Sequence, residues 1–122
     1  MFGHIDRRTI EYSPIRDVIA LASDKWSILI ILYLGYYPVL RFNKLKKHIY
    51  DISNKVLSER LKMLEGDGYI SRELFAEVPI RVEYSLTDFG HSYLKKLLEL
   101  AEWAEKHKGE ILANRKDYNQ NV

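Results

Sequence analysis

The side chains best suited to chemistry in this chain gather between residues 53 and 62, in the segment SNKVLSERLK. Val56, Leu57 and Leu61 recur there at helical spacing, so the segment is predicted to be a helix with one apolar face. The opposite face then carries hydroxyl, amide, ammonium and carboxylate groups, on Ser53, Asn54, Lys55, Ser58, Glu59 and Lys62. Such groups donate and accept hydrogen bonds, which suits recognition of a polar partner. A solvated surface helix is the alternative interpretation.

The other chemistry-bearing residues do not form a catalytic or metal-binding pattern. The four histidines lack a metal-binding spacing such as H-E-x-x-H, and no serine stands in a G-x-S-x-G elbow. The pair Gly66 and Gly68 lacks the third glycine of a dinucleotide-binding loop. We therefore expect no catalytic residues, no metal and no cofactor. The absence of cysteine excludes disulfides, cysteine–zinc sites and thiol chemistry.

Length and charge narrow the class of protein further. A chain of 122 residues is long enough for one domain. Its net charge is only +2, but residues 41–62 contain seven lysines and arginines against two carboxylates. This asymmetry predicts an anionic partner as readily as it predicts a solvated, lysine-rich surface. No apolar run approaches the ~18 residues of a membrane span, and the N-terminus lacks the apolar stretch of a secretory signal.

Periodicity and capping residues predict the order of elements. A helix is expected to start at Ser13-Pro14, the pattern restarts at Ser23, and the second helix stops between Gly35 and Pro38. A brief strand at 39–41, a short helix at 42–49 and the helix capped by Ser53 follow. Alternating runs on either side of a proline-bearing loop predict a β-hairpin, and Thr87 caps a long last helix with a frayed tail from about residue 115.

This order predicts a mainly α fold with a small β-hairpin. Two short helices joined by a tight turn and followed directly by a hairpin are typical of a winged helix-turn-helix DNA-binding domain. We divide the single domain of residues 1–122 into N-terminal helices (12–36), the helix-turn-helix (39–66), the wing (69–86) and a C-terminal dimerisation helix (87–114).

Several motifs in the same order resemble the HxlR-type winged-helix transcriptional regulators of bacteria and archaea, from Tyr12 to about Trp103. The wing sequence EVPIRVEYSLTDFG at 77–90 is the strongest of them. The others are Lys25-Trp26, Arg41-Phe42 with Leu45, Ile52-Ser53 with Lys55 and Leu57, and RLKMLEGDGYI at 60–70. The resemblance implies a DNA-binding transcriptional regulator rather than an enzyme, located in a bacterial or archaeal cytoplasm.

The chain departs from this family's pattern at two places. Members often carry a Cys-Pro pair near the start of the first helix, and in some of them that cysteine senses oxidants, aldehydes or quinones. Here the pair is Ser13-Pro14, and a serine hydroxyl cannot form a sulfenic acid or a disulfide. Thiol sensing is therefore not expected. Ser23-Asp24 also replaces the glycines that usually precede Lys-Trp.

Under this interpretation the second helix of the pair enters the major groove of duplex DNA with its N-terminal residues nearest the bases. Asn54 could then bond to adenine, Lys55 to guanine or phosphate, and Glu59 to the N4 group of cytosine. Lys44 and Lys47 are candidate phosphate contacts, although cations late in a helix are also explained by its dipole. Arg81 on the wing is expected in or beside the minor groove. The alternative is that it pairs with Glu77 or Glu83.

The last helix carries an apolar stripe that is long for a small domain to cover alone. We expect it to form a homodimer interface, as the resemblance also implies, through Leu94, Leu97, Leu98, Ala101 and Trp103. The alternative is that the stripe covers only the chain's own core. Aromatic residues on or near the terminal helices could line a pocket for a small-molecule effector, with Tyr12, Trp26 and Tyr93 as candidates, or they could simply pack the core. A winged helix kept for protein–protein assembly, without an operator of its own, is the alternative function.

Overall fold

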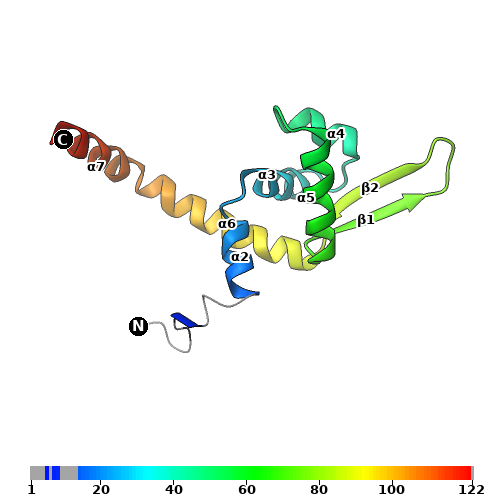
Figure 1. The fold of residues 1–122 in the computed structure, drawn as a ribbon, viewed down its shortest axis with the longest axis horizontal. Helices are drawn as coiled ribbons and strands as arrows, with labels where there is room; N and C mark the ends of the chain where they lie inside the picture. Colours follow the sequence, from blue (N-terminus) through cyan, green and yellow to red (C-terminus); the bar gives the residue numbers. More distant parts are fainter. Residues whose placement is uncertain (1–4, 6, 9–13, 122) are drawn as a thin grey trace.

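The computed structural model describes residues 5, 7–8 and 14–121, which form helices and one short hairpin. The elements are α2 (Ile15–Leu21), α3 (Lys25–Tyr36), α4 (Phe42–His48), α5 (Asn54–Gly66), β1 (Ile70–Phe75), β2 (Arg81–Leu86), α6 (Asp88–Lys106) and α7 (Lys108–Gln120). In Figure 1 the hairpin projects from one side of the body, and α6 and α7 leave it as an arm on the other side. The predicted mainly α fold with a wing after a helix-turn-helix is confirmed.

Helix α3 lies at the centre of the core. Its residues Ile30, Ile31 and Leu34 are at most 1% exposed, and the helix packs against α4, α5, α6 and β2. The predicted start of this helix at Ser23 is wrong, because the Ser23 hydroxyl donates to the Ala20 carbonyl oxygen at the end of α2. The N-cap is Asp24, whose carboxylate accepts the backbone N–H of Ser27 at 3.1 Å.

Helices α4 and α5 are joined by a tight turn. Asp51 adopts a positive φ of 66° in this turn, a conformation that aspartate tolerates better than most residues. The Lys46 ammonium donates to the Ile52 carbonyl oxygen at 2.7 Å and ties α4 to the end of the turn. The predicted cap of α5 is confirmed, since the Ser53 hydroxyl accepts the N–H of Val56 at 3.1 Å.

The hairpin is antiparallel, with Ile70 opposite Leu86 and Phe75 opposite Arg81. The strand predicted at 39–41 is reduced to a single bridge, in which Leu40 exchanges two backbone hydrogen bonds with Tyr84 at 3.0 and 2.8 Å. That bridge fixes the entry to α4 against the base of the wing.

The junction between α5, the hairpin and α6 depends on a close backbone approach. Gly68 has φ 83° after the end of α5 and supplies a left-handed cap to this helix. The Thr87 hydroxyl donates to the Gly68 carbonyl oxygen at 2.6 Å and accepts the N–H of Gly90 at 3.0 Å. A Cβ placed on Gly90 would lie 2.1 Å from the Tyr69 carbonyl oxygen, so only glycine fits there.

The C-terminal helix differs from the prediction of one helix followed by a frayed tail. It breaks at His107 and continues as α7 to Gln120. The His107 ring lies 2.7 Å, through Nδ1, from the Trp103 carbonyl oxygen and stacks on the Trp103 ring with centroids 4.3 Å apart. The Trp103 carbonyl oxygen also accepts the backbone N–H of His107 at 3.1 Å, and the break lies at His107 itself, whose φ of -105° and ψ of 8° depart from helical geometry.

At the other end, Pro14 is the residue before α2, while Tyr12 and Ser13 lie outside the described residues. None of the helices formed by the described residues is by itself long and apolar enough to cross a membrane. Only α2 and α3 taken together reach that composition, and they are bent by 78° where they meet.

The Gly90 contact gives a test of the fold. We expect Gly90→Ala to lower the free energy of unfolding by about 2 kcal/mol or more, because the added methyl group meets rigid backbone. Gly109→Ala is the matched control: its Cβ would enter open space in α7, and stability should be unchanged or slightly raised. Urea denaturation of both variants measures the difference, and equal stability of the two would contradict the packing at the junction.

Candidate nucleic-acid interface

Helix α5 has a buried face and an outward polar face, as predicted. Leu57, Leu61 and Leu64 are at most 2% exposed and pack on the core. The six predicted recognition residues stand on the other side or at the start of the helix, and all are exposed except Ser58, which is half-buried: Ser53, Asn54, Lys55, Ser58, Glu59 and Lys62. The structure therefore brings all six together on one accessible surface.

The start of α5 carries positive potential from two sources. The first-turn N–H groups of a helix lack intrahelical acceptors, and the helix dipole places partial positive charge there. The Ser53 hydroxyl satisfies the N–H of Val56, which leaves the N–H groups of Asn54 and Lys55 at the exposed end. The Lys55 ammonium adds a full charge to the same place. A phosphate approaching this end would meet all of these groups.

The lysines of α4 divide into two kinds. Lys46 is half-buried and engaged with the Ile52 carbonyl oxygen, so it holds the turn together. Lys44 and Lys47 are exposed, and neither has an ion pair among the described residues. These two lysines are the predicted phosphate contacts, and both are exposed enough to reach a phosphate.

On the wing, Arg81 is engaged with carboxylates, as the alternative interpretation held. Its guanidinium donates to Glu83 at 2.8 Å and to Glu77 at 3.0 Å, and it lies 3.8 Å from the centroid of the Phe75 ring. The apolar tip does not fold back, since Val78 is fully exposed and Ile80 is 66% exposed. A DNA contact by Arg81 therefore stays a prediction, and it would require the guanidinium to exchange carboxylate for phosphate.

Sequence reasoning missed Arg72 on β1. This exposed arginine lines a cleft of about 370 Å³ together with Ser58 and Lys62 of α5, and Phe42, Glu65 and Tyr84 complete the lining. The alternation of the strand carried a signal, because Arg72 falls on the same side as the buried Ile70 and hence toward α5. Arg72 and Lys62 place two cations where the recognition helix meets the wing.

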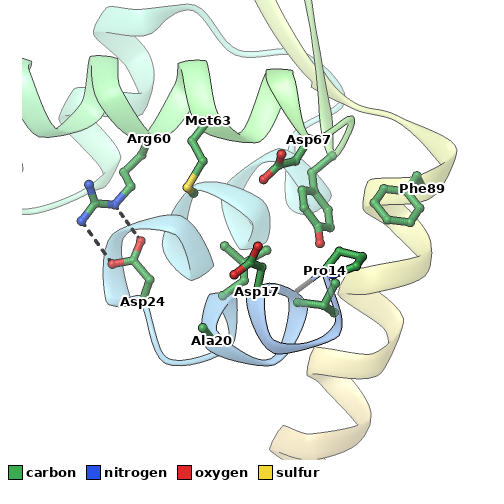
Figure 2. Close-up of a pocket in the computed structure, with 11 residues that line it drawn as sticks. Pro14, Asp17, Ala20, Asp24, Arg60, Met63, Asp67 and Phe89 are labelled. Carbon is green, nitrogen blue, oxygen red and sulfur yellow. Dashed lines mark hydrogen bonds and ion pairs between the residues drawn. The ribbon is translucent and has the colours of Figure 1, made fainter. Parts of the chain in front are cut away.

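A bidentate ion pair fixes α5 against the start of α3. Arg60 Nε lies 2.8 Å from one carboxylate oxygen of Asp24, and a terminal guanidinium nitrogen lies 3.3 Å from the other (Figure 2). The Ser27 hydroxyl also donates to this carboxylate. Burial alone would raise the pKa of Asp24, but the hydrogen bonds from Arg60 and Ser27 outweigh it and hold the pKa below its ordinary value of 3.8.

Two of the residues predicted for an effector pocket, Trp26 and Tyr93, make separate contacts within the fold. Trp26 packs against the core under the Lys25 ammonium, and the Tyr93 hydroxyl donates to the Val18 carbonyl oxygen at 2.9 Å; Tyr12 lies outside the described residues. Neither Trp26 nor Tyr93 lines the cleft of about 640 Å³ that opens between α2 and α5. Both rings pack against the core, which was the alternative interpretation.

The predicted dimer residues on α6 fall into two groups. Leu94 and Leu97 are half-buried and pack on the chain's own core. Leu98 is 47% exposed and Trp103 is 55% exposed, and Ala101 is exposed as well. Ile15 and Ile19 of α2 are exposed as well, so apolar surface remains uncovered on both α2 and α6.

Comparison with known proteins agrees with this architecture. The family model described as HxlR-like helix-turn-helix matches residues 21–111, which is most of the chain. The chain belongs to the HxlR-like helix-turn-helix family. The resemblance noted from the sequence is thereby confirmed.

Relatives in the HxlR-like family are described as regulators. An uncharacterised HTH-type transcriptional regulator of Halalkalibacterium halodurans, BH0655, is 40% identical over 100 residues, covering 82% of this chain and 88% of the relative. YtfH of Escherichia coli, described in the same way, is 37% identical over 105 residues, covering 86% and 82%. The reduced form of the transcriptional regulator YodB from Bacillus subtilis superimposes with a TM-score of 0.70 at 32% identity, covering 78% and 92%. The HxlR-like chain is a transcriptional regulator of the helix-turn-helix type.

The Asp24–Arg60 pair makes the stability of this HxlR-like chain depend on pH. Because the pKa of Asp24 is lower in the folded chain than its ordinary value of 3.8, its contribution is complete above that value and is lost as the pH falls through the lower folded-state pKa. Urea midpoints measured across this range should fall less steeply for Asp24→Asn than for the parent chain. Parallel curves would show that Asp24 has the same pKa in both states.

Proposed function

We propose that the chain binds duplex DNA sequence-specifically, as a homodimer on a palindromic operator. The observation that carries this proposal is the outward polar face of α5, with its capped and positively charged start, beside a projecting hairpin (Figure 1). A helix presented in this way fits the major groove, where base edges offer distinct patterns of donors and acceptors.

Within the groove we assign base contacts to the start of α5. The Asn54 amide suits the paired donor and acceptor of adenine, and Lys55 suits guanine or a phosphate. Glu59 stands one turn further along and suits the N4 amino group of cytosine. A carboxylate facing a polyanion is unfavourable unless it accepts a base donor, so Glu59 would act mainly by discriminating between sequences.

Around these contacts we assign backbone binding to the flanking cations. Lys62 and Arg72 line the cleft between α5 and the wing, and Lys44 and Lys47 are exposed on α4. Phosphate contacts fix register and contribute affinity that depends on salt. Arg81 would add to them only after releasing Glu77 or Glu83.

A homodimer would cover the apolar surface that the terminal helices leave exposed, including Leu98 and Trp103 of α6. A two-fold axis through these helices would present two copies of α5 to the same face of DNA. Their separation of about 34 Å would match successive major grooves and require a palindromic operator. This function places the protein in the cytoplasm of a bacterium or archaeon.

Fluorescence anisotropy tests the function directly. Tiled fragments from upstream of the encoding gene are titrated at two salt concentrations with competitor DNA. One tile bound about 10³-fold more tightly than competitor would establish a specific regulator and locate its operator. If no upstream fragment binds more tightly than competitor DNA, the protein–protein assembly role is favoured instead.

Lys55 provides a test of the recognition surface. Lys55→Ala should weaken binding to that tile and flatten the slope of log affinity against log salt by about one unit, because one phosphate contact is lost. Lys116→Ala, an exposed lysine of α7, is the control of equal charge change and should leave the slope unaltered. Identical slopes for both variants and the parent would remove Lys55 from the interface.

Leu98 provides a test of the homodimer. We expect Leu98→Glu to shift the chain from dimer to monomer in sedimentation-velocity measurements, because a charge would be buried at the interface. Leu74→Glu on the wing is the control, since Leu74 is 51% exposed against 47% for Leu98. If the parent chain sediments as a monomer, or if both variants stay dimeric, α6 is not the dimer interface.

A further inference from the structure

The cleft between α2 and α5 lies on the inner side of α5, away from the proposed DNA surface. It has a volume of about 640 Å³, and Figure 2 shows α2 on one side, α5 on the other and α6 at one end. Met63 points into it from α5, and Phe89 closes the end next to α6 (Figure 2). The cleft is therefore lined by residues of α2, α5 and α6.

One end of the cleft is aromatic and apolar. Tyr69 is 4% exposed, and its ring centroid lies 4.8 Å from that of Phe89, with the rings tilted by 35°. Phe89 is 54% exposed, although it sits beside a buried core, and Met63 also lines the cleft. Aromatic faces attract organic cations, and this attraction strengthens when water is excluded.

The charge at the same end is negative. Asp67 directly follows the C-terminus of α5, where the helix dipole places partial negative charge. Asp17 faces the cleft from the opposite wall and is itself engaged in an interaction (Figure 2). The cation in the lining, Arg60, is already paired with Asp24. Burial first, and then the charge of Asp67, raise the pKa of Tyr69, which is consistent with a negative potential there.

We propose that this cleft binds a small organic cation, an ammonium group carried on an apolar body. The ammonium would lie between Asp67 and the Phe89 ring, and the apolar body would lie along Met63 toward α2. An organic anion would meet the carboxylates and the helix C-terminus, so it is disfavoured. A metal ion is a poor fit, because the described residues contain no group of three or more metal-ligating side chains.

This site also connects to the proposed DNA-binding function, on which its regulatory consequence rests. Arg60 and Met63 line the cleft and belong to α5, the helix that also carries Lys55 and Lys62. A cation held between α2 and α5 would therefore change the contacts that hold α5 in place. Binding of the cation itself does not require DNA. It can therefore be measured separately from the function proposed above.

The experiment uses the two methionines of the chain, Met1 and Met63, labelled with ¹³C at the methyl group. Met63→Leu assigns the signals. The probe is benzyltrimethylammonium, and benzoate is the aromatic comparator of opposite charge. We expect saturable movement of the Met63 signal with benzyltrimethylammonium at millimolar concentration and none with benzoate.

Two variants test the assigned contacts. Asp67→Asn should weaken probe binding by about three- to fivefold, because one partly exposed charge pair is lost. Phe89→Leu should weaken it by about threefold through loss of the ring. Glu65→Gln removes a carboxylate at the same end of α5 that does not line this cleft, and it should bind like the parent. No Met63 response, an equal response to benzoate, or Asp67→Asn binding like the parent would overturn the proposal, whether or not the chain binds DNA.

Discussion

The structure depends on the burial of α3, because α4, α5, α6 and β2 are each placed by contact with it. A helix with apolar residues on all sides must be covered on all sides, and α4, α5, α6 and β2 together cover it. Ile30, Ile31 and Leu34 are consequently removed from water. The same packing fixes the angle at which α5 and the hairpin leave the core, so the interior of the domain sets the geometry of its proposed working surface.

Helix α5 is anchored to the core on its inner side, and the residues on its outer side do not contribute to packing. Leu57, Leu61 and Leu64 fill the core, and Arg60 is clamped by Asp24 at the start of α3. Since these residues meet the needs of the fold, Asn54, Lys55 and Glu59 are not needed for packing. An exposed polar face on a well-anchored helix loses little entropy when it docks, and this pre-organisation favours recognition.

The elements that follow from local signals could be predicted from the sequence. Ser53 and Thr87 cap helices as expected, and the period-2 alternation located both strands. The errors concern helix ends. Helix α3 begins at Lys25 after the cap Asp24, whereas Ser23, where the pattern was predicted to restart, bonds back to Ala20 at the end of α2. The break at His107 was not predicted, and no apolar periodicity marks α7 as a helix. The alternation of β1 indicated which face Arg72 lies on, but its position beside Lys62 depends on how the hairpin packs against α5.

Arg81 on the wing and Lys55 on α5 differ in how much free energy a phosphate contact would yield. Arg81 is held by Glu77, Glu83 and the Phe75 ring, so moving it to phosphate replaces two existing charge pairs and yields little net free energy. Among the described residues Lys55 has no ion pair to give up, and the helix dipole already opposes its charge. Phosphate binding at Lys55 relieves an unfavourable interaction, whereas at Arg81 it must first break favourable ones. Lys55 should therefore contribute more salt-dependent affinity than Arg81, whose ion pairs with Glu77 and Glu83 are already formed within the wing.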